Sequence, residues 1–412
     1  MNDETPGGPL AGYRVLELTT TVAGPFCGRL LADFGAEVIK VERPHGDDLR
    51  TFGKTVQGKS LYAGSLLRNK ALIAVDLRKS EGQEVIHKLV PHCDVVVENF
   101  RPGTLERWRL GFEQLSALNP ALVMVRISGF GQSGPYSKRP GYGIIAEALS
   151  GLRHLTGHAD APPPRVAVAL TDYIAGIYAA FGAMVALHHA RNTGQGQVVD
   201  AALYESAFSV TEQHVPAYGK LGEVANRHGH RLPSSSPNNL YYCKDGRYIL
   251  ITAHAQSLFT RLCVAMGKPE LVEDSRFSNA EARSSNEDAL DDIISAWSSG
   301  LSLEEAESVL HEAEIPASRV FDMADIFADP HYRAREMLTE LPDEELGSLI
   351  TPSVVPKLSA TPGKLNWSGR HVGEDTEQVL TELAGLSRAE VDRLEAGGIV
   401  TRYNGGGTTS NG

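Results

Sequence analysis

Asp172 is the side chain whose surroundings in this sequence favour chemistry most clearly. It precedes a stretch in which large apolar residues recur at helical spacing from Ile174 to Val185, a pattern that predicts an amphipathic helix. A carboxylate at the start of a helix meets unpaired backbone N–H groups and the positive end of the helix dipole, and both favour its ionised form. Asp172 therefore has two interpretations, a carboxylate kept ionised for a chemical role or an ordinary helix cap worth about 1 kcal/mol.

The predicted helix has a second face that is nearly flat. Between the large apolar residues lie only small ones, namely Ala175, Gly176, Ala179, Ala180, Gly182 and Ala183. Asn192 and Gly194 supply the signals that end a helix.

A second group of residues could bind an anionic ligand. Arg43 follows a predicted buried strand, where a guanidinium can hold a phosphate through two hydrogen bonds. Asn99 and Phe100 end another strand and offer an amide and a ring on which a nucleobase could stack. Either feature alone more often has only a structural role. The prediction of an anion-binding site therefore depends on further basic residues in neighbouring loops, which are Arg78, Arg101, Arg107, Lys138 and Arg139.

Composition and charge exclude several classes of protein. The chain has 412 residues, of which 42% are hydrophobic and 22% charged, and a net charge of −12. These values predict an ordinary globular protein with no nucleic-acid or anionic-membrane surface. No stretch is expected to span a membrane, and the first residues lack a secretion signal. Four cysteines without metal-ligand spacing indicate a cytoplasmic protein with no metal site.

The elements that must position these residues alternate between strand and helix. Buried strands are predicted at Arg14–Leu18, Glu37–Val41, Leu72–Val75, Asp94–Val97 and Leu122–Ile127. This order predicts an α/β protein with a Rossmann-like parallel sheet wound on both faces. Ligands of such sheets bind outside the carboxyl ends of the strands, so we expect the chemistry in the loops that follow them: Thr19–Pro25, Glu42–Arg50, Glu98–Pro102 and Ser128–Gly143.

The rest of the chain predicts a second, smaller domain. We expect the N-terminal part of a large ligand-binding domain at 10–205 and a polar, Pro- and Ser-rich linker at 206–239. A hairpin around Asp245-Gly246 opens a smaller α+β domain at 240–325. A linker and C-terminal segment follow at 326–400, and 401–412 is expected to be a disordered tail.

Several stretches, taken in order, resemble the class III CoA-transferase family, of the formyl-CoA and carnitine transferase type. They span most of residues 10–210 and are Val15–Leu18 with Ala23–Pro25, Ala32–Glu42, Glu98–Gly103, Ser128–Gly131, Pro140–Tyr142, and Asp172 followed by Gly194–Gln197. Each stretch is weakly specific alone, whereas their order and spacing are specific.

The resemblance implies transfer of CoA from an acyl-CoA donor to a free carboxylic acid, with a CoA thioester as substrate and no permanently bound cofactor. Asp172 would be the nucleophile that forms an acyl anhydride and then an aspartyl-CoA thioester. The large domain at 10–205 would bind CoA. The family fold is an interlocked homodimer, and the long linkers of this chain suit it.

Residues that match family positions are expected to contact the substrates. The contacts with CoA would come from Arg43, Arg78, Asn99, Phe100, Arg107 and Lys138, with Arg139 beside them. The acyl group would meet Thr20, Thr21, Val22, Ala23 and Tyr142.

The acyl pocket is expected to differ from that of the oxalate-specific members of the family. Those members have a glutamine where this chain has Val22, and a glycine-rich loop where His254–Ser257 stands here. The sequence therefore predicts a larger acid, a C4–C6 dicarboxylate such as succinate, with succinyl-CoA or a similar donor.

Two alternatives remain at this point. An α-methylacyl-CoA racemase would share the fold but needs a histidine where Tyr142 stands, and a phenol with a pKa near 10 is a poor proton-transfer partner. A non-catalytic CoA-binding protein would use Asp172 only as a helix cap.

Overall fold

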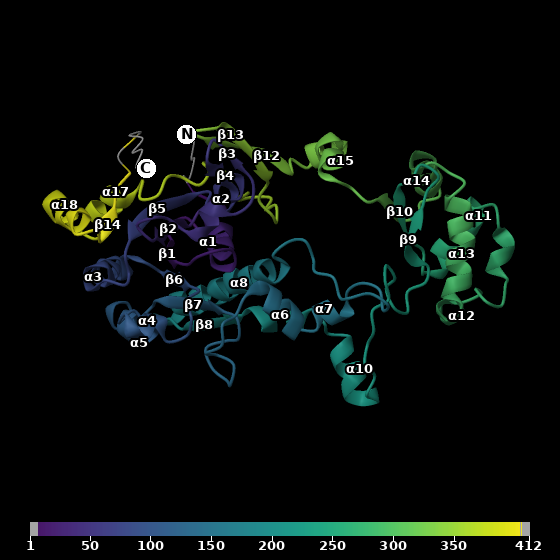
Figure 1. Ribbon diagram of the computed structural model, residues 1–412, viewed down its shortest axis with the longest axis horizontal. Coiled ribbons are helices and arrows are strands. Elements are labelled where there is room, and N and C mark those ends of the chain that lie inside the picture. Colours follow the sequence, from purple (N-terminus) through teal and green to yellow (C-terminus); the bar gives the residue numbers. More distant parts are fainter. Residues whose placement is uncertain (1–6, 404, 406–412) are drawn as a thin grey trace. The chain divides into compact units, whose positions relative to one another are not determined.

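The computed structural model describes residues 7–403 and residue 405 (Figure 1), so the predicted tail at 401–412 lies mostly outside the described residues. By their contacts these residues form two units. The larger unit contains the chain up to Leu152, Val166–Val215, and the chain from Arg333 onward. The smaller unit contains Arg153–Arg165 and Pro216–Tyr332.

A sheet of seven strands forms the centre of the larger unit within the described residues. Its order is β14 (Val400–Thr401), β5 (Lys70–Val75), β2 (Glu37–Glu42), β1 (Arg14–Leu18), β6 (Val95–Glu98), β7 (Val123–Ser128) and β8 (Val198–Ala202). All neighbours pair in parallel except β14, which pairs antiparallel with β5. The predicted parallel α/β sheet is confirmed.

Helices cover both faces of this sheet, which explains why its strands are apolar almost without alternation. Val95 and Val97 of β6 face a cluster that includes α1 (Ala23–Asp33) and α8 (Leu170–Thr193), while Val96 faces the opposite cluster. Helices of that opposite cluster are α3 (Ser80–Leu89), α4 (Thr104–Arg107), α5 (Phe112–Leu118), α17 (Thr376–Glu382) and α18 (Arg388–Ala396).

The strand order reverses between β1 and β6. From β1 the chain proceeds outward through β2 and β5, then returns to place β6 on the other side of β1. A crevice opens at such a reversal, and it is where open α/β sheets bind ligands. Here the two loops that border it are joined directly, because Thr20 N–H donates to Asn99 Oδ1 (2.9 Å) and Asn99 Nδ2 donates to the Thr20 carbonyl (2.8 Å).

Helix α8 packs into the fold through its face of small residues. Ala175, Gly176, Ala179 and Ala183 are buried, whereas Phe181 on the large apolar face is 65% exposed. A methyl group added to Gly176 would lie 2.8 Å from Phe26 Cδ1 and 3.0 Å from the Ala23 carbonyl of α1. The small face therefore permits close helix packing, and α1 and α8 lie side by side in Figure 1.

The length and apolarity of α8 correct one expectation from the sequence. The helix has 24 residues with a mean hydropathy of 1.5 and is long and apolar enough to cross a membrane by these criteria alone. We expected no such stretch. The core helix of a soluble protein meets the same criteria, and 44% of this apolar window is buried within the fold.

The remaining elements of the larger unit surround this core. Helices α2 (Leu61–Leu66) and α6 (Gly143–Leu149) border the site described below, and α9 (Leu203–Ser209) packs against α6 and α8. Two short hairpins consist of β3 (Thr55–Val56) with β4 (Lys59–Ser60), and β12 (Leu338–Asp343) with β13 (Gly347–Pro352). The four short segments α7 (Leu152–Leu155), α10 (His214–Leu221), α15 (Met323–Ala328) and α16 (Pro330–Ala334) lie at or near the unit boundaries.

The smaller unit is an α+β structure with a core of its own. Its antiparallel sheet has the order β11 (Ala317–Arg319), β10 (Tyr248–Thr252) and β9 (Asn238–Tyr242). Helices α11 (Gln256–Ala265), α12 (Ala280–Ser285), α13 (Glu287–Ser298) and α14 (Leu303–Glu312) accompany it. The hairpin predicted from Asp245-Gly246 is present, with Gly246 at φ 82.

Candidate active site

Asp172 is the third residue of α8, and the residue that caps this helix is Ala169. The interpretation of Asp172 as an ordinary helix cap is therefore wrong, because the residue that caps α8 stands three positions earlier. The side chain lies within the first turn, where the N–H groups of a helix have no intrahelical partners.

The carboxyl group of Asp172 is half-buried, and this changes its acidity. Burial raises the pKa of Asp172 from 3.8 to about 6, and a hydrogen bond from its own backbone N–H opposes the shift only in part. From the sequence we considered only the helix start, which favours the ionised carboxylate. The cost of removing this carboxylate from water acts in the opposite direction and was left out. At neutral pH the carboxylate is still mostly ionised, and it is more basic than an exposed aspartate.

A second helix begins at the same point. Helix α6 starts at Gly143, and a methyl group added there would lie 2.0 Å from Asp172 Oδ2. The hydroxyl of Thr171 donates to the Gly143 carbonyl (2.9 Å) and joins the two helix starts. Asp172 is thus placed against the first turn of α6 as well as its own, so the N-terminal ends of two helices are near the carboxylate.

Two tyrosines that the sequence did not indicate lie near Asp172. The hydroxyl oxygens of Tyr62 and Tyr173 are 2.8 Å apart. Burial, the contact with Tyr173 and the charge of Asp172 raise the pKa of Tyr62 above its ordinary value. A phenol held neutral in this way can donate a hydrogen bond to an oxyanion. No sequence pattern connects Tyr62 with Asp172, because Tyr62 lies in α2, 110 residues away along the chain.

The Thr20–Ala23 loop connects the crevice of the sheet to α8. Thr20 is held by Asn99 at the crevice, and Val22 and Ala23 begin α1. The ring of Phe26 in α1 packs edge-on against that of Tyr173, the neighbour of Asp172, with centroids 4.7 Å apart. The loop expected to line an acyl pocket therefore lies between the crevice and the helix that carries Asp172.

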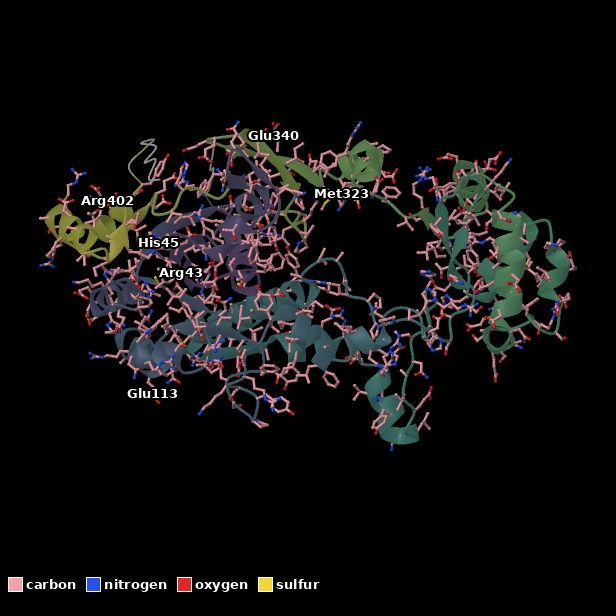
Figure 2. The ribbon with its side chains drawn as sticks, in the orientation of Figure 1. Arg43, His45, Glu113, Met323, Glu340 and Arg402 are labelled. Atoms are coloured by element: carbon pink, nitrogen blue, oxygen red, sulfur yellow. The ribbon has the colours of Figure 1, made fainter. Side chains whose placement is uncertain are left out.

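A cavity of about 240 Å³ opens at the carboxyl ends of β1, β2 and β5. It brings together four of the expected substrate contacts, which are Thr20, Arg43, Arg78 and Phe100. Arg43 lies in the loop after β2, as does His45 (Figure 2). The walls also include Trp108, whose ring packs edge-on against Phe100 at 5.1 Å.

Both arginines of this cavity already have carboxylate partners. Arg43 Nη2 is 2.5 Å from Asp48 Oδ1, and Arg78 Nη2 is 2.8 Å from Asp76 Oδ2. Both guanidinium groups are exposed. Because exposed ion pairs of this kind are weak, a phosphate can replace these partners.

The other predicted contacts are placed elsewhere in the larger unit. Arg107 donates to Thr104 Oγ1 (3.0 Å) in α4, and Arg139 packs over the ring of Tyr136, 3.7 Å from its centroid. Lys138 is exposed in the same loop, and Tyr142 is an exposed residue that precedes α6. None of these four lines the 240 Å³ cavity. Asp172 does not line it either.

Two further features of the larger unit lie away from these residues. A cavity of about 740 Å³ opens at the amino ends of β1, β2 and β5, opposite the edge at which such sheets bind ligands. Among the described residues, Glu344, His371 and Glu374 have ligand atoms within 4.8 Å of one another and could hold a metal ion. Lys59 and Arg370 line the same recess, where they pair with Asp343 and Glu374.

The fold is an α/β architecture whose strand order reverses between β1 and β6, and open sheets of this kind bind ligands at that point. The sequence profile of CoA-transferase family III matches residues 10–376. The chain belongs to this family, and it is a CoA-transferase whose substrates are CoA thioesters and acids.

Related proteins and solved structures match almost the whole length of this chain. The succinyl-CoA–D-citramalate CoA-transferase of Chloroflexus aurantiacus is 45% identical over 97% of this chain and 100% of its own. The succinyl-CoA–L-malate CoA-transferase beta subunit of the same organism is 42% identical over 97% and 100%. A CAIB/BAIF family protein from Brucella suis superposes with a TM-score of 0.82 at 33% identity, over 92% of this chain and 100% of that one.

Proposed function

We propose that the enzyme transfers CoA from succinyl-CoA, or a similar donor, to a free C4–C6 dicarboxylic acid, with Asp172 as the nucleophile. The observation that carries this proposal is the placement of a half-buried, basic carboxylate against the first turns of α6 and α8. The two relatives described above are named for succinyl-CoA as donor and for citramalate or malate as acceptor. These acceptors contain four and five carbon atoms, respectively for malate and citramalate, and each has two carboxylates.

The reaction proceeds through covalent intermediates on Asp172. A carboxylate oxygen attacks the thioester carbonyl, and the tetrahedral intermediate expels CoA as a thiolate, which leaves an acyl anhydride on Asp172. The thiolate then attacks the aspartyl carbonyl, releases succinate and forms an aspartyl-CoA thioester. The acceptor carboxylate attacks this thioester and expels the CoA thiolate, which leaves a second anhydride between Asp172 and the acceptor acid. The thiolate finally attacks the acceptor carbonyl of this anhydride, which forms the new CoA ester and restores the free Asp172 carboxylate.

The surrounding groups stabilise the negative charge that each step develops. Backbone N–H groups at the starts of α6 and α8 can donate to a tetrahedral oxyanion. Tyr62 remains protonated and supplies a hydroxyl donor in the same region. The Thr20–Ala23 loop and Tyr142 would border the acyl group. The nucleotide end of CoA would occupy the 240 Å³ cavity beside Arg43, Arg78 and Phe100, with Asn99, Arg107, Lys138 and Arg139 in the adjoining loops.

We also propose that the active enzyme is a cytoplasmic homodimer of the interlocked type. The apolar face of α8 is exposed in the single chain at Ile177, Tyr178, Phe181 and Val185, and such a continuous apolar surface marks a protein–protein contact. In this arrangement residues 10–205 begin the CoA-binding domain, 240–325 form the small domain, and 326–400 return to the large domain.

Substrate transfer is tested with a panel of CoA esters against a panel of dicarboxylic acids, read by the mass of the new thioester. We expect succinyl-CoA with malate, citramalate or a related C4–C6 acid to give a product. Asp172→Asn should fold and lose transfer by at least about 10³-fold, since an amide is not a nucleophile. Retention of most transfer by this variant would overturn the assignment.

The racemase alternative has a separate test. Tyr142 stands where a racemase base would be needed, and it is exposed. Incubation of a 2-methylacyl-CoA with the enzyme in heavy water should introduce no deuterium at the α-carbon, whereas a racemase would exchange this hydrogen.

A further inference from the structure

The loop before α1 contains a strained residue. Thr21 has φ 63, a left-handed conformation that is uncommon for any residue with a Cβ and an outlier for a β-branched one. Strain of this kind costs about 1–3 kcal/mol and persists only where neighbouring contacts enforce it. The contacts that enforce it here come from three side chains.

Three side chains hold the two peptide units of the Thr19–Thr21 turn. The Thr19 carbonyl accepts from Lys40 Nζ at 2.7 Å. Thr20 exchanges two hydrogen bonds with Asn99. The N–H of Thr21 donates to Asp47 Oδ1 at 3.1 Å. The turn is therefore fixed from β2, from the loop after β2, and from the loop after β6.

Lys40 and Asp47 belong to a buried group of charges beneath this turn. Lys40 Nζ is 2.9 Å from Asp47 Oδ2 and 3.3 Å from Glu17 Oε1, and the three side chains are almost completely buried. Asp47 Oδ1 accepts from Leu49 N–H (2.9 Å) as well as from Thr21. One carboxylate thus connects the lysine to the strained peptide.

The charges of this group are maintained by their mutual contacts. Burial would lower the pKa of Lys40, but Asp47, Glu17 and Glu42 together raise it above its ordinary value. Burial would raise the pKa of Asp47, but Lys40 and the N–H groups of Leu49 and Thr21 lower it. Buried ion pairs add little net stability compared with apolar packing. The main effect of this group is therefore on the conformation of the turn above it.

The geometry points to Lys40 and Asp47 as positioning residues that hold the Thr19–Thr21 turn in its strained form between the CoA cavity and the helix of Asp172. Thr19, Thr20 and Asp47 line the cavity, and the turn leads directly into α1, which packs on α8. The consequence for catalysis rests on the proposed function, whereas the holding of the turn does not.

The holding of the turn is tested by hydrogen–deuterium exchange of the full-length protein, read on a peptide that covers residues 19–23. Lys40→Met removes the charge and the hydrogen bond to Thr19 while keeping a long apolar stem. We expect exchange in this peptide to rise by at least about tenfold.

Arg68→Met is the matched control for this experiment. Arg68 is also fully buried and paired, with Nε and Nη2 at 2.9 Å and 2.6 Å from the Asp33 carboxylate, but it contacts Pro352 and Thr351 instead of the turn. The Arg68→Met substitution should lower the melting temperature of the protein. Hydrogen exchange at residues 19–23 and the transfer rate of the folded enzyme should stay close to wild type. Equal exchange at 19–23 in wild type and Lys40→Met would overturn the proposal.

The catalytic consequence is read from kcat and KM separately. Lys40→Met should lower kcat for transfer by at least about tenfold and change KM for the acyl-CoA less than about threefold, because misplaced groups are felt mainly in the transition state. An unchanged kcat in a folded variant with a loosened turn would refute this consequence. If the wild type itself transfers no CoA, the proposed function fails, while the exchange result still decides the holding of the turn.

A second variant covers the case in which Lys40→Met does not fold. Asp47→Asn keeps an oxygen acceptor for the N–H groups of Thr21 and Leu49 but removes the charge that faces Lys40. It should loosen residues 19–23 in the same direction and to a smaller extent. No change in exchange for this variant would also contradict the proposal.

Discussion

The acidity of Asp172 is the property of a single residue that has the most direct kinetic consequence. Its pKa is raised to about 6 by burial, and only the ionised form can attack a thioester. We therefore expect kcat/KM to rise with pH through about 6 and to level off above about 7, where roughly nine-tenths of the carboxylate is ionised. A pH–rate profile between pH 4 and 8 measures this midpoint. A midpoint near 4, as for an exposed aspartate, would contradict it.

The same shift makes the stability of the protein depend on Asp172 in a predictable direction. Because the folded-state pKa is raised, the neutral carboxyl favours the fold below about pH 4, and this contribution is lost as pH rises through about 6. Asp172→Asn cannot ionise, so it should melt at a higher temperature than wild type at pH 7.5, with the difference vanishing near pH 4. Thermal melts at the two pH values check this, and a lower melting temperature for the variant at pH 7.5 would show that its charge stabilises the fold.

At the scale of elements, the site depends on two helices that begin together. Gly143 begins α6, and a methyl group there would lie 2.0 Å from Asp172 Oδ2. Gly143→Ala should therefore displace the carboxylate and lower kcat by about 10- to 100-fold, since a misplacement of this size is costly. Alanine favours helices, so the melting temperature should change little.

Gly219→Ala is the control for this substitution. Gly219 lies in α10, and a methyl group added there would have no neighbour within 4 Å. Its kcat should remain that of wild type. Steady-state kinetics and melts of both variants decide the matter, and unchanged turnover in Gly143→Ala would show that α6 does not confine Asp172.

The elements also show how far the sequence could be interpreted. The strand predicted at Arg14–Leu18 has those bounds in the structure, because a short apolar run between turn signals leaves little ambiguity. The start of α8 was placed too late, since Ala169 caps it without a side-chain hydrogen bond. Tyr62 was missed because tertiary packing alone brings α2 to Tyr173. The raised pKa of Asp172 was missed because desolvation is set by the whole fold.

At the scale of the whole molecule, the exposed apolar face of α8 predicts association. Phe181 is 65% exposed and has Ile177, Tyr178 and Val185 around it on the same helix. Phe181→Asp should prevent assembly of the dimer, so that the purified variant is monomeric and transfers less CoA, because a charge cannot be buried unpaired in an apolar contact. Light scattering after size exclusion measures the mass. Leu118→Asp, on an exposed position of α5, should leave the dimer intact, and a wild-type protein that runs as a monomer would contradict the proposal.

The measurement that tests the central claim most directly is the detection of acylated Asp172. The protein is incubated with succinyl-CoA without an acceptor, trapped with hydroxylamine or borohydride, digested and sequenced by mass spectrometry. We expect a modification at Asp172 that appears only with the CoA ester and is absent from Asp172→Asn. CoA transfer by an enzyme in which the Asp172 peptide stays unmodified, or in which another carboxylate is trapped, would contradict the account.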